Sequence, residues 1–287
     1  MKRCALAVMI SLTLAACGGD EIIDTSKPSE LSKPFTPMEA VGLYGGQQEK
    51  PLIAILNGGR YYVVSYTRGA ILLIHGTKSK PLGKGHFSSL DAKLFNLSGD
   101  DDKSQDIIMS AELDENDIKR TLKITLDSEL NSGLKEIKEL YNPEYEQKIG
   151  IQELAKGVFH NSGATTFLAR KPSGEADKAN IHSNITLTFT EDGVVTYTED
   201  EESGLCSATG KVSEIADAGH VYDISLEFRN KTQPQAESCA YNGQKLSGVV
   251  IYTPHKKWHL RTLLANEARS EAMVLRGKRA EASTSQN

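Results

Sequence analysis

Two carboxylate-rich segments are the first candidates for metal chemistry in this chain of 287 residues. One is Asp100-Asp101-Asp102, and the other contains Asp114, Glu115 and Asp117. Calcium takes several oxygen ligands, so clustered carboxylates suit it. Neither segment has the ligand spacing and central glycine of an EF-hand loop, and both are typical of solvated hairpin tips. We therefore predict no metal site at either segment.

A second candidate is the pair His255 and His259, which flanks Trp258. The surrounding pattern favours a strand, and residues four apart in a strand are separated by about 13 Å. That distance is too long for one metal ion, so we predict no metal ligand here. Trp258 is the only tryptophan, and its predicted place is the core or the rim of a domain, with a ligand platform as the alternative.

The chain has none of the short motifs that identify common catalytic sites. It contains no HExxH zinc motif, no GxxxxGK[ST] phosphate loop and no GxSxG nucleophile turn. Serines are numerous, but none stands in a recognisable catalytic frame. The sequence therefore predicts a protein that is not an enzyme and has no cofactor. A hydrolase is the alternative, because catalytic groups can converge from distant positions in the sequence.

The N-terminus has the pattern of a removable secretory signal. Lys2 and Arg3 precede an apolar run, residues 5–14, which is too short to span a bilayer because a span needs about 20 apolar residues. The next residues, Leu14-Ala15-Ala16-Cys17, resemble the lipobox of bacterial lipoproteins. An ordinary signal peptide with a chance cysteine is the alternative.

The lipobox resemblance implies a membrane anchor. In that family the chain is cleaved before the cysteine, so residues 1–16 are the expected signal peptide and Cys17 the expected lipidation site. The thiol is acylated with diacylglycerol and the new amine is acylated again, and several acyl chains anchor stably. Gly18 follows the cysteine where Asp tends to retain such proteins in the inner membrane, so the resemblance favours the outer membrane. The periplasmic or cell-surface side stays open.

The remaining cysteines predict one disulfide. Of four cysteines, Cys4 leaves with the signal and Cys17 becomes the anchor, so Cys206 and Cys239 remain. An even pair in an oxidising compartment favours a disulfide. A thiol pair for metal or redox chemistry is the alternative, but it lacks CxxC spacing and a nearby histidine.

The charge of the mature chain argues against nucleic acid as a partner. Removing 16 of 287 residues leaves 271, and the loss of two basic residues takes the formal net charge from −5 to about −7. Nucleic-acid binding needs a concentrated basic surface. The length suits two small domains. Residues 17–36 are polar and contain two Lys-Pro pairs, which predict a flexible tether, and residues 280–287 predict a disordered tail.

Between the tether and the tail, the dominant hydrophobic period is two, which predicts strands. Apolar residues alternate with threonines over residues 185–190, and Asp192-Gly193 then predicts a hairpin turn. A second alternating strand, residues 222–228, has Asp223, Ser225 and Glu227 on its polar face. The segment 52–66 forms a similar hairpin, but its arms are continuously apolar, so we expect its outer face to be covered.

An internal duplication relates these hairpins. A shift of 134 residues places Gly59 on Gly193 and Gly85-His86 on Gly219-His220 without a gap, and an insertion within residues 168–183 accounts for a different offset upstream. The two histidines follow equivalent glycines, which predicts a shared structural role. At the end of the first repeat, residues 134–141 fit either a short helix or a closing strand.

The predicted fold is therefore all-β, with two tandem antiparallel domains over residues 37–145 and 149–279. Closure into barrels hides edge strands best, and a β-sandwich is the alternative. The Gly-x-Tyr and Gly-x-Phe starts at Gly42 and Gly157, followed by meandering hairpins, resemble the lipocalin-like barrels of bacterial surface lipoproteins.

Taken together, these features predict a non-enzymatic outer-membrane lipoprotein that presents two β domains to a protein partner. The alternative is a carrier of a small hydrophobic ligand inside one barrel, because eight strands can either enclose a ligand or fill with side chains.

Overall fold

The computed structural model describes residues 40–47, 50–67, 70–83, 85–97, 104–115, 119–127, 134–161, 166–170, 176–177, 184–199, 206–231, 239, 241–256 and 259–280. The predicted signal peptide, the tether and Cys17 lie outside these residues, as do Asp100–Asp102, Asp117, Trp258 and residues 281–287. Both barrels belong to one compact unit of the chain. None of the described helices has the length and apolar character that crossing a membrane requires.

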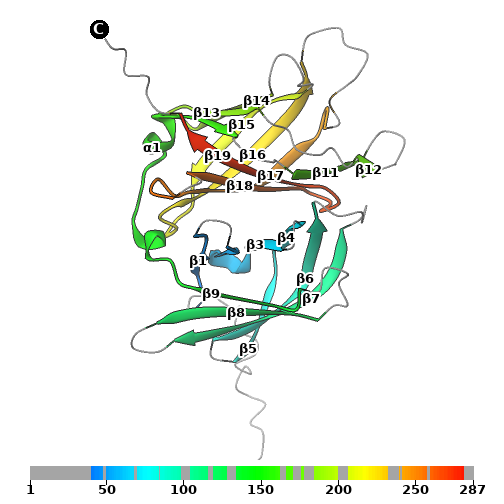
Figure 1. Ribbon diagram of the computed structural model, residues 1–287, viewed down its shortest axis with the longest axis vertical. Helices are drawn as coiled ribbons and strands as arrows, with labels where there is room; N and C mark the ends of the chain where they lie inside the picture. Colours follow the sequence, from blue (N-terminus) through cyan, green and yellow to red (C-terminus); the bar gives the residue numbers. More distant parts are fainter. Residues whose placement is uncertain are drawn as a thin grey trace, which may run out of the picture. The chain divides into compact units, whose positions relative to one another are not determined.

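The first half of the described chain is an antiparallel barrel, called barrel 1 (Figure 1). Its strands are β1 (Gly42–Gly45), β2 (Leu52–Ile55), β3 (Tyr61–Thr67), β4 (Ala70–Gly76), β5 (Ser79–Gly83), β6 (His86–Asn96), β7 (Gln105–Glu115), β8 (Arg120–Asp127) and β9 (Glu136–Leu140). Eight of them follow one another in the sheet, and β5 pairs separately with β6. A bridge between Tyr44 and Tyr141 joins the two ends. The segment 134–141 is therefore the closing strand and not a helix.

The second half forms barrel 2, which closes by strand pairing. Its strands are β10 (Val158–Asn161), β11 (Thr166–Arg170), β12 (Ala176–Asp177), β13 (Ile185–Phe189), β14 (Val194–Glu199), β15 (Cys206–Glu214), β16 (Val221–Asn230), β17 (Lys245–Tyr252), β18 (Leu260–Asn266) and β19 (Ala272–Arg279). Strand β10 pairs with both β13 and β19, which closes an eight-stranded ring and decides against a sandwich.

Three short helical segments lie in connections between the described strands. A 3-10 turn, η2 (Asn57–Gly59), links β2 to β3, while η3 (Pro143–Glu146) and the helix α1 (Ile151–Ala155) connect the two barrels. In the β13–β14 hairpin, Gly193 has φ +82°, a left-handed conformation that favours glycine, and an added Cβ would lie 2.6 Å from the carbonyl oxygen of Val212. The predicted Asp192-Gly193 turn is thus confirmed.

The predicted correspondence between the two repeats matches the strand order. Strand β2 precedes the Gly59 turn as β13 precedes the Gly193 turn. The starts of β6 (residue 86) and β16 (residue 221) differ by 135 residues, within one residue of the predicted shift of 134. The hairpin β11–β12 falls where the alignment requires the insertion, and β11 pairs with β19 beside β10.

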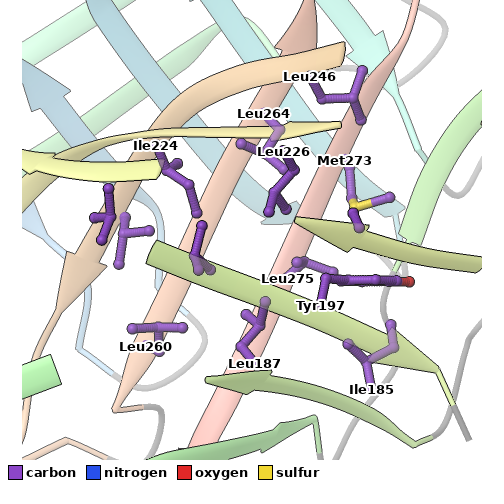
Figure 2. Packing of buried hydrophobic residues seen from close by; sticks show 14 of the residues in the cluster. Ile185, Leu187, Tyr197, Ile224, Leu226, Leu246, Leu260, Leu264, Met273 and Leu275 are labelled. Atoms are coloured by element: carbon purple, nitrogen blue, oxygen red, sulfur yellow. The ribbon is translucent and has the colours of Figure 1, made fainter. Parts of the chain in front are cut away.

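Side chains fill the interior of each barrel. Figure 2 shows labelled residues of β13, β14 and β16–β19 converging inside barrel 2, with Leu226 and Leu264 among them. The alternating positions of β16, residues 222–228, point inward as predicted. In barrel 1 a separate cluster, which includes Tyr61, Phe87 and Met109, occupies the interior.

A third apolar cluster, the inter-barrel core, joins the outer faces of the two barrels. It consists of Leu43, Leu52, Ala54, Leu56, Tyr62, Val64, Ile71, Leu73, Phe95 and Leu97 of barrel 1, Val221, Val249, Ile251, Leu263, Ala265, Ala272 and Val274 of barrel 2, and Tyr145 and Ala218. Strands β2 and β3 are thus buried on both faces, which confirms the prediction from the continuously apolar segment 52–66, and β4 is buried in the same way. The barrels therefore share part of their hydrophobic core.

Candidate functional site

A groove of about 690 Å³ opens where the inter-barrel core ends, and both barrels line it. It is called the inter-barrel groove here, and most of its lining residues have polar or charged side chains. The lining residues are Arg60, Tyr62, His75 and Thr77 of barrel 1 and Lys211, Ser213, Asp223, Ile224, Ser225, Lys245, Ser247, Gly248, Ala265, Asn266, Glu267 and Arg269 of barrel 2.

The outward faces of β15, β16 and β17 form much of the groove wall that belongs to barrel 2, and the end of β18 with the β18–β19 hairpin adds to it. Strand β17 begins with alternation, Lys245 and Ser247 being exposed and Leu246 buried, and then becomes continuously buried from Gly248 onward. Because alternate residues face opposite sides of a sheet, Val249 continues the outward face of Ser247. The same face is therefore polar in the groove and apolar under barrel 1.

Gly248 allows the close strand approach beneath this face. A Cβ added to it would lie 1.9 Å from the carbonyl oxygen of Leu263 on β18, so a larger residue would push the two strands apart.

Ion pairs between the barrels hold the groove walls together. The Arg60 guanidinium, after the β2–β3 turn, lies 2.5 Å from Asp223 on β16. Arg269, in the β18–β19 hairpin, lies 3.1 Å from Asp91 on β6. The Asp91 carboxylate also accepts hydrogen bonds from the backbone N–H groups of Thr77 and Lys78.

The hydrogen bonds at Asp91 keep this carboxylate ionised. Burial acts to raise the pKa of Asp91, but the hydrogen bonds from Thr77 and Lys78 and the Arg269 charge outweigh it, so the pKa lies below its usual value. Asp91 is thus a charged anchor for the hairpin that borders the groove.

His75 is a buried neutral imidazole on the barrel 1 side. Its Nδ1 lies 2.9 Å from the carbonyl oxygen of Tyr61, which requires Nδ1 to donate and leaves Nε2 as an acceptor. The ring stacks on Tyr62 with centroids 4.3 Å apart. Burial, followed by the charges of Arg269 and Arg60, lowers the pKa of His75.

The groove contains His, Asp and Ser side chains, but they do not form a catalytic triad. The Nδ1 of His75 bonds to a backbone carbonyl, and Asp223 pairs with Arg60. No hydrogen bond between described residues joins His75 to a serine, which a nucleophile and its base would require. Likewise, the described His, Cys, Asp and Glu residues form no group of three that could hold a metal ion.

The predicted disulfide is present between Cys206 and Cys239, whose Cα atoms are 4.9 Å apart. It lies away from the groove, at the start of β15. The backbone N–H of Cys206 donates to the buried carboxylate of Glu199, which also accepts a hydrogen bond from Tyr197. This pairing has a structural role in barrel 2.

The other predicted candidates do not converge. Asp114 and Glu115 are exposed at the end of β7, as expected of a hairpin tip. His255 lies in the turn after β17 and not in a strand, so the predicted strand through both histidines was wrong, and His259 accepts a hydrogen bond from the backbone N–H of Arg279.

The shared role predicted for the paired histidines was also wrong. His220 is buried, with Nδ1 2.7 Å from the carbonyl oxygen of Tyr252, whereas His86 is exposed. Equivalent positions in the repeats therefore have different surroundings.

The groove is not apparent in the sequence. Alternation places Asp223 and Ser225 on a polar face, but no sequence pattern joins them to Lys211, Lys245 or Arg60. No protein-family model, curated protein sequence or solved structure matches this chain.

Proposed function

We propose that this chain is a lipid-anchored, non-enzymatic recognition protein of the outer membrane, and that it binds a protein partner in the inter-barrel groove. The observation that carries the proposal is the contrast between the barrel interiors and the inter-barrel groove. The inward side chains of both barrels pack into buried apolar clusters, whereas the groove of about 690 Å³ is open and has many polar and charged side chains in its lining. A few converging polar groups in a concave site are typical of recognition.

The packed interiors weigh against the alternative, a carrier of a hydrophobic ligand. A carrier needs an enclosed apolar space, and the inward side chains of barrel 2 pack into one continuous cluster (Figure 2). Extraction of the protein in a mild detergent, followed by native mass spectrometry, should therefore detect no stoichiometric lipid ligand apart from the covalent anchor.

A photo-crosslinking residue at position 247 tests the recognition function in the full-length protein in cells. Ser247 is exposed in the groove, so we expect an adduct of defined mass with a protein partner. The same probe in place of Ile108, 61% exposed on β7 away from the groove, is the control. Equal adducts at both positions, or none at either, would reject the groove as the recognition site.

Replacement of the anchor cysteine tests the membrane attachment. Cys17→Ser removes the thiol that the lipobox resemblance identifies as the acylation site, so the protein should leave the membrane fraction and lose its acyl mass. Continued fractionation of the variant with membranes would refute the anchor. Protease treatment of intact and lysed cells then assigns the wild-type protein to the cell surface or the periplasm.

A further inference from the structure

The inter-barrel groove is positively charged although the chain as a whole is acidic. Four cationic side chains line the groove, Arg60, Arg269, Lys211 and Lys245, against two carboxylates, Asp223 and Glu267. The formal excess is therefore +2 from the lining residues, or +1 when Asp91 is included as the partner of Arg269. The net charge of the full chain is −5. A cleft of one sign concentrates ligands of the opposite sign.

The four cations have different roles. Arg60 and Arg269 are engaged in ion pairs that connect the two barrels. Lys211 and Lys245 are exposed, and neither forms an ion pair with another residue that the structure describes. These two lysines are thus the cations that a ligand can engage without breaking a contact between the barrels.

The strand register places the two lysines around a pair of serines. Lys211 on β15 is opposite Ser225 on β16, which in turn is opposite Ser247 on β17, and Lys245 lies two residues before Ser247. Lys211 and Lys245 are two strand spacings apart across the sheet and two residues apart along it, which separates them by about 12 Å at the backbone. The hydroxyls of Ser225 and Ser247 make no hydrogen bond to another described residue, so they are donors available between the two charges.

This geometry favours separate carboxylates over a single phosphate. A compact phosphate is bound best by converging donors and forked guanidinium groups, but the two arginines are already paired and the lysines are separated. Acidic side chains at alternate positions of an extended peptide lie on one face about 7 Å apart, a spacing that flexible lysines can reach.

Side-chain recognition is also the mode that the fold allows here. Strand pairing closes each barrel. In barrel 1 the bridge between Tyr44 and Tyr141 joins the two ends of the sheet, and in barrel 2 β10 pairs with both β13 and β19. Strands β15, β16 and β17, which line the groove, are each paired on both sides within the part of the chain that the structure describes, so a partner cannot add a strand to them.

We propose that the inter-barrel groove binds an acidic segment of the protein partner, with Lys211 and Lys245 pairing with two of its carboxylates and Ser225 and Ser247 donating hydrogen bonds between them. This inference rests on the proposed function and specifies the chemistry of the partner.

A binding titration with synthetic peptides tests the proposal on the full-length protein in detergent. The probe is a fluorescent, extended peptide that alternates Glu and Thr, and its matched control replaces each Glu with Gln. The Glu peptide should bind and weaken with added salt, while the Gln peptide should not bind. Lys211→Gln and Lys245→Gln should each weaken binding about threefold, and the double variant about tenfold.

Lys123→Gln is the matched protein control. Lys123 lies on β8, pairs with Glu136 3.1 Å away, and does not line the groove, so its loss changes the net charge equally. This variant should bind the Glu peptide as the wild type does. Equal weakening by Lys123→Gln, or unchanged binding in the double variant, would overturn the proposal.

Competition experiments test whether another anion binds the groove better than an acidic peptide. Together with the crosslinking result, they also distinguish a failure of this proposal from a failure of the proposed function. Inorganic phosphate or an acidic oligosaccharide that displaces the peptide at lower concentration than the unlabelled peptide itself would overturn the peptide assignment. Crosslinking at position 247 without Glu-peptide binding rejects only the acidic chemistry. Glu-peptide binding without any crosslinked partner in cells rejects the proposed function instead.

Discussion

At the scale of single residues, the fold controls the charge of His75. Its ring is buried against Tyr62, and Arg60, Arg269 and Asp91 are the charged groups facing it. Burial first, and the two arginines next, lower its pKa from the ordinary value of 6.5, against a raising effect of the Tyr61 hydrogen bond and Asp91. The folded state thus favours the neutral imidazole.

The pH dependence of stability follows from that shift. Below pH 6.5 the unfolded state binds the proton first, so the free energy of unfolding falls as the pH drops from 6.5 toward the folded pKa of His75. We expect thermal unfolding between pH 7 and pH 5 to show a smaller pH dependence in His75→Gln than in the wild type. His86→Gln, at an exposed position on β6, is the control and should keep the wild-type dependence. An unchanged slope in His75→Gln would contradict this account.

At the scale of elements, the disulfide ties β15 to the segment between β16 and β17. The bridge spans 33 residues of sequence, and the N–H of Cys239 donates to the Asn230 side chain at the end of β16. Closing a loop of that length should stabilise barrel 2 by roughly 3–4 kcal/mol on the chain-entropy model.

Cys206→Ser should therefore lower the free energy of unfolding by about that amount, measured by urea denaturation. A reductant should lower the stability of the wild type similarly and leave the double variant Cys206→Ser/Cys239→Ser unaffected. Equal stability of the wild type with and without reductant would contradict the stabilising role of the bridge.

At the scale of the whole molecule, the inter-barrel core couples the two barrels. Val249 and Leu263 of barrel 2 pack in the same buried cluster as Leu52 and Val64 of barrel 1. Separating the barrels would expose this apolar surface to water, at about 25 cal/mol for each Å². We therefore expect the described part of the chain to unfold in one cooperative transition.

Val249→Asp tests this coupling. A carboxylate buried in the inter-barrel core should lower the free energy of unfolding by roughly 3 kcal/mol and resolve two transitions in a calorimetric scan. Ser247→Asp, two residues earlier on the same face but exposed in the groove, should change stability by less than about 0.5 kcal/mol. Two well-separated transitions in the wild type would show that the barrels are independent.

The sequence by itself determined several of the strands and which of their faces are buried. Alternation over residues 222–228 identified the inward face of β16, Asp192-Gly193 identified a turn, and the continuous apolar run at residues 52–56 predicted a strand covered on both faces. These features are local, because side-chain period and turn conformation depend on neighbouring residues. The pairing of Cys206 with Cys239 followed from counting.

Only the tertiary structure decided the groove. Lys211 and Lys245 look in the sequence like any solvated residues of amphipathic strands, and Arg60 looks like the end of a turn. They become neighbours because the strand register aligns β15 with β17 and because barrel 1 covers the apolar end of the same face. Register and packing between distant segments depend on contacts that no short stretch of sequence encodes, so the charge of this site appears only when both barrels are assembled.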